Sequence, residues 1–282
     1  MRPTGVCPKE NVVVSAEPTE SPYSLALTVA YDGLAFAGYA RQPGQVTVQG
    51  RLEAALSIAL RRDVSTAVAG RTDAGVHALG NVVSCEAFGD EPNDDALLRS
   101  LNALAGEGIV IRRIRRAHAG FSARSDAIER EYRYRIVNGV VPPLFLGRIA
   151  WGVRKPLDLE AMRTAAAHLV GELDFRSFCV TASSLGKRTF RRIDAIEIRR
   201  EEHLGEQCIV VRILGNAFLH SMVRVVVGSL VEVGSGRRDA AWLADALVAC
   251  ERAAAGPTAP AHGLTLWRVG YPDGVWLRDA SE

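Results

Sequence analysis

The spacing of apolar and polar positions predicts short strands and amphipathic helices along most of the chain. After Thr47, a predicted N-cap, apolar residues recur every three or four positions from Val48 to about Arg62, which is the spacing of one helical face. Asp94 is the predicted cap of a second helix. In the same half of the chain we expect strands at Ser24–Tyr31, Asn81–Ala87 and Gly108–Ile114.

The second half of the chain begins this pattern again. Asp158 is predicted to cap a helix that stops at Gly171, and a polar turn at Glu201–Gly205 separates two strands that we expect to pair. Because strands occur in adjacent pairs as well as alternating with helices, the order favours antiparallel α+β layers over a doubly wound sheet. The remaining predicted elements are the strands Glu131–Val137, Ile193–Ile198, Gln207–Leu214 and Leu264–Val269 and the helices Phe218–Val233 and Ala240–Arg252.

We therefore predict an α+β fold of two similar α/β halves, each with a mainly antiparallel sheet flanked by helices. The first half covers residues 23–125 and the second covers residues 126–272, with the junction near Ser125–Arg130. Residues 1–22, which contain four prolines, and residues 273–282 are predicted tails. A cleft between two such halves is the default place for a substrate, so we expect the active site there.

Composition narrows the classes of function without selecting one. Of the 282 residues 48% are hydrophobic and the net charge is only +2, so the chain buries a substantial core and is not a bulk polycation. Only three of its 34 basic residues are lysines, and arginine presents a planar fork that suits phosphates and base edges. The five cysteines form no C-x-x-C pair, and neither a secretory signal nor a membrane-spanning run is visible. We expect a cytoplasmic protein without disulfides or structural zinc.

The segment Ala69–Ala78, with the sequence AGRTDAGVHA, carries the most informative chemistry. Gly70 and Gly75 permit backbone conformations that are closed to other residues, so we expect a tight loop that presents Asp73 close to the guanidinium of Arg71. An ionised carboxylate in such a loop can act as a nucleophile or a base. The alternative is a structural aspartate that caps a turn and pairs with Arg71. The loop alone does not separate these two interpretations.

The predicted strand Glu131–Val137 carries aromatic and basic side chains whose role the pattern leaves open. Alternation along a strand places Tyr132 and Tyr134 on one face and Arg133 and Arg135 on the other. The tyrosines either fill the core, with the arginines in water, or form an aromatic platform for a base beside phosphate-binding arginines.

The most apolar predicted helix contains two basic residues, His220 and Arg224, four positions apart. A buried arginine requires an acceptor, so Arg224 pairs either with an acid such as Glu232 or with Asp73. For His220 we expect the role of a hydrogen-bonded histidine at a helix end. In the small-residue loop before the last strand, Leu264 is the residue with enough bulk to pack on a ligand.

Several common reaction classes have no motif in this chain. The sequence contains no G-x-x-x-x-G-K-[ST], G-x-G-x-x-G or G-x-S-x-G motif and no His/Cys cluster with metal-ligand spacing. Redox, ATP-dependent and metal-assisted reactions therefore lack sequence support. What remains is acid–base or covalent chemistry centred on a carboxylate, with no cofactor and no metal.

Taken together, these segments resemble the tRNA pseudouridine synthase A family from about Ser24 to Pro272. The most specific piece is the Gly70–Ala78 loop, and the order and spacing of the others make a chance similarity implausible. The other matching pieces include Tyr31-Asp32-Gly33, Phe121-Ser122-Ala123, Tyr132-Arg133-Tyr134, Asp174-Phe175, Asn216-Ala217-Phe218, Met222-Val223-Arg224, Gly228-Ser229-Leu230 and Gly263-Leu264.

The resemblance implies the pseudouridine synthase fold and a defined reaction. The expected reaction converts uridine to pseudouridine at positions 38–40 of the tRNA anticodon arm, without a cofactor, on a base taken out of its stack. Carried over residue by residue, Asp73 is the catalytic aspartate, Arg71 its basic neighbour, Tyr132 the residue that stacks on the uracil and Arg224 a basic residue facing the aspartate. Leu264 is a further expected substrate contact. The resemblance also implies a homodimer that binds tRNA across both subunits.

Three positions depart from the family's pattern. Gly38-Tyr39-Ala40 stands where the family usually has Gly-Trp-Gln, Gly120 replaces an arginine, and Asn81 replaces a common glutamine. These departures bear on tRNA contacts rather than on Asp73. The alternatives are a non-catalytic RNA-binding protein, a nucleoside glycosidase that would need a second carboxylate, and a pseudouridine synthase for other RNA positions.

Overall fold

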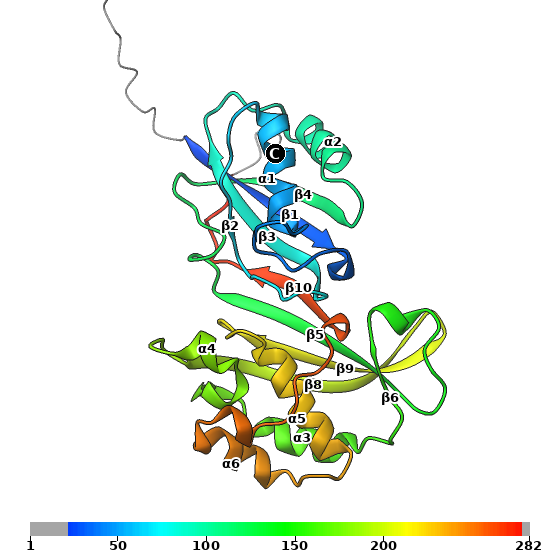
Figure 1. Cartoon of the computed structure of the whole chain (residues 1–282). Coiled ribbons are helices and arrows are strands. Elements are labelled where there is room, and N and C mark those ends of the chain that lie inside the picture. Colours follow the sequence, from blue (N-terminus) through cyan, green and yellow to red (C-terminus); the bar gives the residue numbers. More distant parts are fainter. Residues whose placement is uncertain (1–21, 278–282) are drawn as a thin grey trace, which may run out of the picture.

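A ten-stranded sheet runs through residues 22–277, the part of the chain that the computed structural model describes (Figure 1). Its main path has the order β4-β1-β3-β10-β5-β9-β8-β7, with β2 paired to β3 and β6 paired to β5. Pairing is antiparallel except between β10 and β3 and between β5 and β6. The strands are β1 (Tyr23–Tyr31), β2 (Ala67–Val68), β3 (His77–Ala87), β4 (Ile109–Ala117), β5 (Glu129–Asn138), β6 (Trp151–Val153), β7 (Gly171–Asp174), β8 (Phe190–His203), β9 (Glu206–Gly215) and β10 (Leu264–Gly270).

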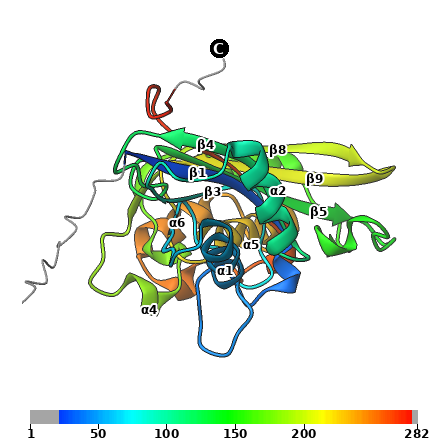
Figure 2. The same ribbon diagram turned by 90° about the horizontal axis from the view of Figure 1, so that it is seen from above.

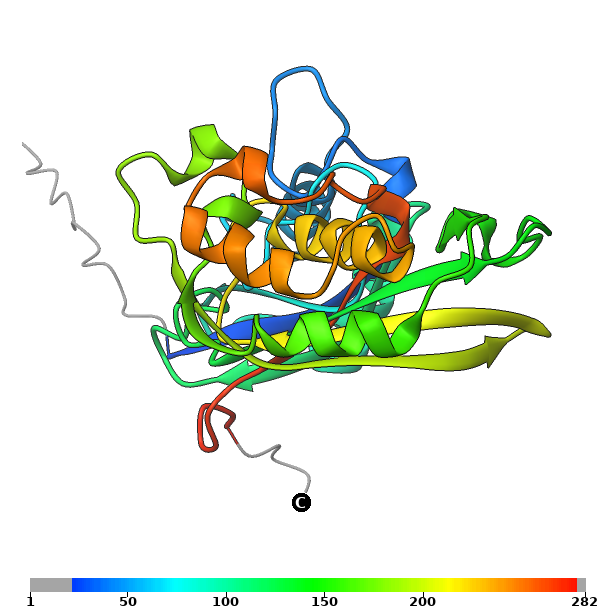
Figure 3. The same ribbon diagram turned by 90° about the horizontal axis from the view of Figure 1, so that it is seen from below.

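Six α-helices accompany this sheet in the described part of the chain. Figures 2 and 3 show α1, α5 and α6 together on one face of the sheet. Every second residue of a strand points to the same side of the sheet. On β1 the residues in one such set, Leu25, Leu27 and Val29, are apolar and belong to the main core cluster. The helices are α1 (Val48–Leu60), α2 (Asp94–Leu104), α3 (Leu159–Ala167), α4 (Thr181–Ser184), α5 (Met222–Gly234) and α6 (Ala241–Ala249).

The predicted α+β class with mainly antiparallel pairing is confirmed, and the two halves share one sheet. Strand β10 comes from the end of the chain, yet it pairs with β3 of the first half and with β5 of the second. The sheet is therefore continuous across the junction. The predicted boundary between two domains at residue 125 stays a prediction. The predicted tails lie mostly outside the described residues, since the structure describes neither 1–21 nor 278–282.

Most predicted elements form, and several of their ends differ from the sequence prediction. Asn93, rather than Asp94, caps α2, because its side-chain oxygen accepts a hydrogen bond from the backbone N–H of Ala96 at 2.9 Å. Helix α3 ends at Ala167, four residues before Gly171. Helix α6 ends at Ala249, because Cys250 adopts a left-handed φ of 52°. Helix α5 begins at Met222 rather than Phe218, because Ser221 adopts a left-handed φ of 59° that a helix cannot continue through.

Strand β8 is longer than predicted. It spans Phe190–His203, whereas the prediction stopped at Ile198, because the polar residues at its end pair with β9 out to a tight turn at Leu204 and Gly205. No helix among residues 22–277 combines the length and apolar composition that crossing a bilayer requires.

Helix α5 packs so closely against the segment before β10 that we expect a side chain added at this contact to destabilise the protein. A Cβ atom at Gly228 of α5 would lie 1.8 Å from the carbonyl oxygen of Pro257. We expect Gly228→Ala to lower the free energy of unfolding by about 2 kcal/mol through overpacking, despite a gain of about 1 kcal/mol in helix propensity. Urea unfolding measures the change. Gly152→Ala is the control, because its Cβ would lie 3.8 Å from the Pro143 Cδ atom, and an equal loss in both variants would contradict the prediction.

Candidate active site

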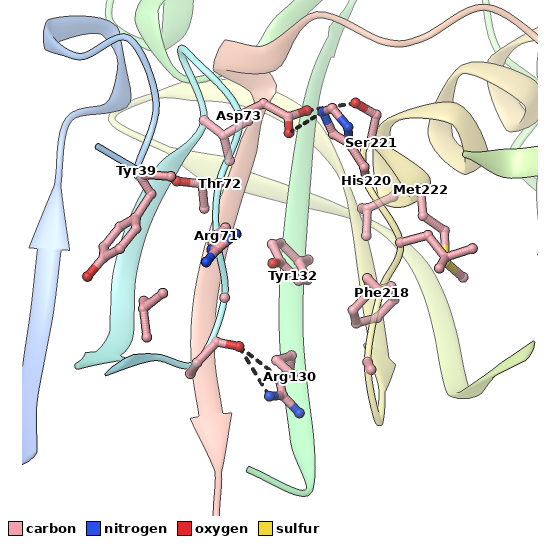
Figure 4. A pocket seen from close by; sticks show the side chains of 18 of the residues that line it. Tyr39, Arg71, Thr72, Asp73, Arg130, Tyr132, Phe218, His220, Ser221 and Met222 are labelled. Atoms are coloured by element: carbon pink, nitrogen blue, oxygen red, sulfur yellow. Dashed lines mark hydrogen bonds and ion pairs between the residues drawn. The ribbon is translucent and has the colours of Figure 1, made fainter. Parts of the chain in front are cut away.

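A cavity of about 1110 Å³ gathers the predicted site residues from both halves of the chain. Its walls include Arg71 and Asp73 from the loop before β3, Tyr132 from β5, Arg224 from α5 and Leu264 from the start of β10. All five residues nominated from the sequence thus line one space, part of which is shown in Figure 4.

The loop that carries Asp73 is held by a buried and a partly buried hydrogen bond. The hydroxyl groups of Tyr31 and Thr72 lie 2.8 Å apart, and Asn81 donates a hydrogen bond to the carbonyl of Gly70 at 2.8 Å. Gly75 has a φ of +80°, a conformation that glycine adopts without strain. Asn81, although it replaces the family's usual glutamine, therefore anchors the loop in this chain.

The Asp73 carboxylate receives donors from the segment that opens α5. Arg224 Nη1 lies 2.7 Å from Oδ2, and the Ser221 hydroxyl donates to the same oxygen at 2.8 Å. His220 Nε2 lies 3.3 Å from Oδ1. Arg224 is fixed in turn by a hydrogen bond from Nε to the carbonyl of Ala259 at 2.8 Å. The sequence left two partners open for Arg224, and the structure pairs it with Asp73.

Arg71 does not supply the countercharge that the sequence suggested. Within residues 22–277 Asp73 forms an ion pair with Arg224 and a contact with the His220 imidazole, and it forms neither with Arg71. Thr72, between Arg71 and Asp73, is buried against Tyr31, whereas Arg71 is exposed on the cavity wall. Arg71 is therefore adjacent to Asp73 on the cavity wall but is not paired with it within residues 22–277.

The tyrosines of β5 have different surroundings. Tyr132 is 8% exposed, packs edge-to-face on Phe218 with ring centroids 5.2 Å apart, and lines the cavity. Burial raises the pKa of its phenol group above the ordinary value. Tyr134 lies in the core and donates a hydrogen bond to the carbonyl of Pro260 at 2.8 Å. One tyrosine is therefore a candidate platform for a base and the other is a core residue.

Two arginines of β5, Arg133 and Arg135, do not line this cavity. Arg133 and Arg135 both pack against the ring of Trp267, with guanidinium carbons 3.9 and 5.4 Å from its centroid. The predicted alternation along β5 is thus observed, but the basic side of the strand lies on the other face of the sheet.

The buried Arg130 is a structural residue of the site that sequence reasoning missed. Its guanidinium donates to four backbone carbonyls, those of Ala69, Arg124, Ala127 and Asn216, at distances of 2.7 to 3.3 Å. It therefore connects the Asp73 loop, the junction between the halves and the segment before α5. Burial lowers the pKa of Arg130, and no signal in the sequence distinguished it from the other arginines of β5.

The cavity wall is also more basic than the net charge suggests. Arg124, Lys187, Arg191 and Arg192 line the same space as Asp73. Positive charges gathered in a hollow attract a polyanion even when the whole chain is nearly neutral. No group of three or more His, Cys, Asp or Glu side chains suited to a metal ion occurs among residues 22–277.

Known proteins resemble this chain over most of its length. A family model described as tRNA pseudouridine synthase matches residues 165–272. A protein of Brevibacillus brevis named tRNA pseudouridine synthase A is 45% identical over 247 residues, which covers 88% of this chain and 99% of the relative. A protein of the same name from Burkholderia lata is 43% identical over 249 residues, with 88% and 90% covered.

Solved structures are more distant. A chain of a Cbf5–Nop10–Gar1 complex aligns with 73% of this chain and 45% of its own length, at a TM-score of 0.34 and 15% identity. The identity to the Brevibacillus and Burkholderia proteins, over nearly their whole length, is decisive. The chain belongs to the tRNA pseudouridine synthase A family.

Proposed function

We propose that this protein converts uridine to pseudouridine at positions 38–40 of the tRNA anticodon stem-loop, with Asp73 as the catalytic carboxylate. Family membership makes it an isomerase that acts on tRNA. The observation that carries the residue assignment is the Asp73 carboxylate, held by Arg224 and Ser221 on the wall of a cavity that Tyr132 also lines. No cofactor enters the proposed reaction.

The reaction requires a carboxylate that is positioned and charged. The base must leave C1′ through nitrogen, turn, and rejoin the ribose through C5. Asp73 can attack C1′, attack C6 of the uracil, or take a proton from C2′, and each of these acts uses a lone pair of the carboxylate. The guanidinium of Arg224, 2.7 Å from Oδ2, provides a countercharge that favours this form.

The uridine must leave its stack before it reaches Asp73. Extruding a nucleotide takes a few kcal/mol, and stacking on an aromatic side chain returns about 1–3 kcal/mol per base. In our proposal Tyr132 provides that stacking surface and Leu264 an apolar contact beside it. Arg71, exposed on the same wall, is assigned to the RNA backbone.

The proposed partners follow from the resemblance to the tRNA pseudouridine synthase A family. We propose that the enzyme binds the tRNA anticodon arm as a homodimer in the cytoplasm. Light scattering of the purified protein, with and without tRNA, measures the mass. A mass of 30.4 kDa for the free protein would correspond to the monomer and contradict the dimer.

The decisive experiment maps pseudouridine chemically in tRNA incubated with the purified protein. Signal at positions 38–40 supports the proposal, and signal at other positions keeps the chemistry but changes the substrate position. Binding of tRNA with no pseudouridine would favour the non-catalytic RNA-binding alternative.

Asp73→Asn should abolish pseudouridine formation, because an amide cannot act as the nucleophile or base. RNA affinity should stay close to that of the wild type, since the side chain keeps its size. Asp63→Asn is the matched control, because Asp63 is exposed and lies outside this cavity. Turnover by Asp73→Asn at the wild-type rate, measured on tRNA in single-turnover reactions, would exclude the assignment.

Two substitutions, Tyr132→Ala and Tyr132→Phe, distinguish the contribution of ring stacking to the rate from that of the hydroxyl group. If stacking dominates, alanine should lower kcat/KM by about 10-fold or more, corresponding to a stacking energy of about 1–3 kcal/mol, and phenylalanine should have a milder effect. Steady-state kinetics on tRNA measure both variants. Equal and complete loss in both would assign the essential role to the hydroxyl group instead.

Arg224→Gln and Arg224→Lys test the countercharge. Glutamine leaves Asp73 without its guanidinium partner, and we expect kcat/KM to fall by about 10²-fold, or about 3 kcal/mol. Lysine keeps the charge but cannot contact Asp73 and the carbonyl of Ala259 together, so its loss should be intermediate. Equal kinetics for glutamine and the wild type would remove Arg224 from the proposed machinery.

A further inference from the structure

The two oxygens of the Asp73 carboxylate have different surroundings. Oδ2 accepts hydrogen bonds from both Ser221 and Arg224, whereas the contact of Oδ1 is with His220 Nε2 at 3.3 Å. The Asp73 side chain is 20% exposed and the His220 side chain is 52% exposed. The imidazole therefore touches both the carboxylate and solvent, and Figure 4 shows it facing Asp73.

The backbone at Ser221 is strained in a way that creates this contact. Ser221 has a φ of 59° and a ψ of 7°, which is uncommon for a residue other than glycine. It is the N-cap residue of α5, yet its hydroxyl makes no capping bond and donates to Asp73 instead. This turn directs the consecutive side chains of His220 and Ser221 to one carboxylate. Strain of this kind concentrates at functional sites.

The isomerisation proposed above needs a group that accepts a proton from carbon. Once C5 has replaced N1 on C1′, C5 carries both C1′ and its original hydrogen, and that proton must leave beside Asp73. Among the cavity-lining residues, the arginines and the lysine are cations with no lone pair to offer. Tyr132 is buried, and its phenol has a raised pKa, so it is a poor source of phenolate. Apart from Asp73, which the proposed function already assigns to the attack on the nucleotide, His220 is the lining side chain suited to accepting a proton near neutral pH.

We propose that His220 is the catalytic base that removes the C5 proton, an inference that rests on the proposed pseudouridine synthase activity. The C5–H bond breaks and its electron pair forms the C5=C6 double bond. The N1=C6 pair moves onto N1, and Nδ1 of the imidazole takes the proton, because Nε2 faces Oδ1 of Asp73. The imidazolium then returns a proton to N1, so no proton is gained or lost overall. Oδ1 of Asp73, a carboxylate again at this stage, stabilises the imidazolium through the observed contact.

Deuterium at C5 of the target uridine tests this step in the full-length enzyme. We expect His220→Gln to lower kcat by about 10²-fold, the usual contribution of general base catalysis, with little change in KM. The isotope effect on kcat should rise above that of the wild type, because removal of the C5 proton becomes slower than the other steps. Added imidazole should restore turnover to His220→Ala, since the position is exposed at the cavity wall.

A matched control and the contrary outcomes make the test decisive. His203→Gln, at the far end of β8, should leave the rate and the isotope effect unchanged. Wild-type kinetics in His220→Gln overturn the inference, and so does a lower rate with an unchanged isotope effect and no rescue by imidazole. If the wild-type protein makes no pseudouridine in any tRNA, that result refutes the proposed function itself and is distinct from a failure of the His220 assignment.

Discussion

The ion pair between Asp73 and Arg224 is the interaction on which the site depends. The two residues are 151 positions apart in the sequence, and the pair connects the loop before β3 to helix α5 across the cavity. Arg224 also binds the carbonyl of Ala259, so a third segment is fixed by the same guanidinium. Both side chains are about four-fifths buried, where the loss of either partner leaves a charge that is expensive to keep.

A second arginine, Arg130, also connects segments around the cavity, but its partners are backbone carbonyls rather than a carboxylate. Arg130 satisfies its donors with four backbone carbonyls, and these belong to the segments that surround the cavity. Carbonyl dipoles offset part of the cost of burying the cation, and the planar guanidinium sets the directions from which they approach. The cavity is thus bounded by segments that two buried arginines hold at fixed separations.

Two glycines, Gly228 and Gly263, allow the close packing that both stabilises the second half of the chain and positions Arg224. Gly228 allows the segment at Pro257 to pass against the helix, and a Cβ at Gly263 would lie 2.5 Å from the ring of Tyr134. This segment carries the Ala259 carbonyl that orients Arg224. Side chains at these glycines would displace the segment, so the close packing that stabilises the second half also aims the countercharge at Asp73.

The sequence by itself determined most elements and the α+β class, because periodicity and caps are local properties of the chain. It nominated Asp73 as the reacting group through the family resemblance of the AGRTDAGVHA loop, and that role is a proposal. It did not determine that the halves share one sheet through β10 or that Arg224 rather than Arg71 meets Asp73. It also missed Arg130, and the left-handed turn at Ser221 that brings His220 to the carboxylate. Those features arise when distant segments pack, since burial and charge pairing depend on neighbours that the local sequence does not specify.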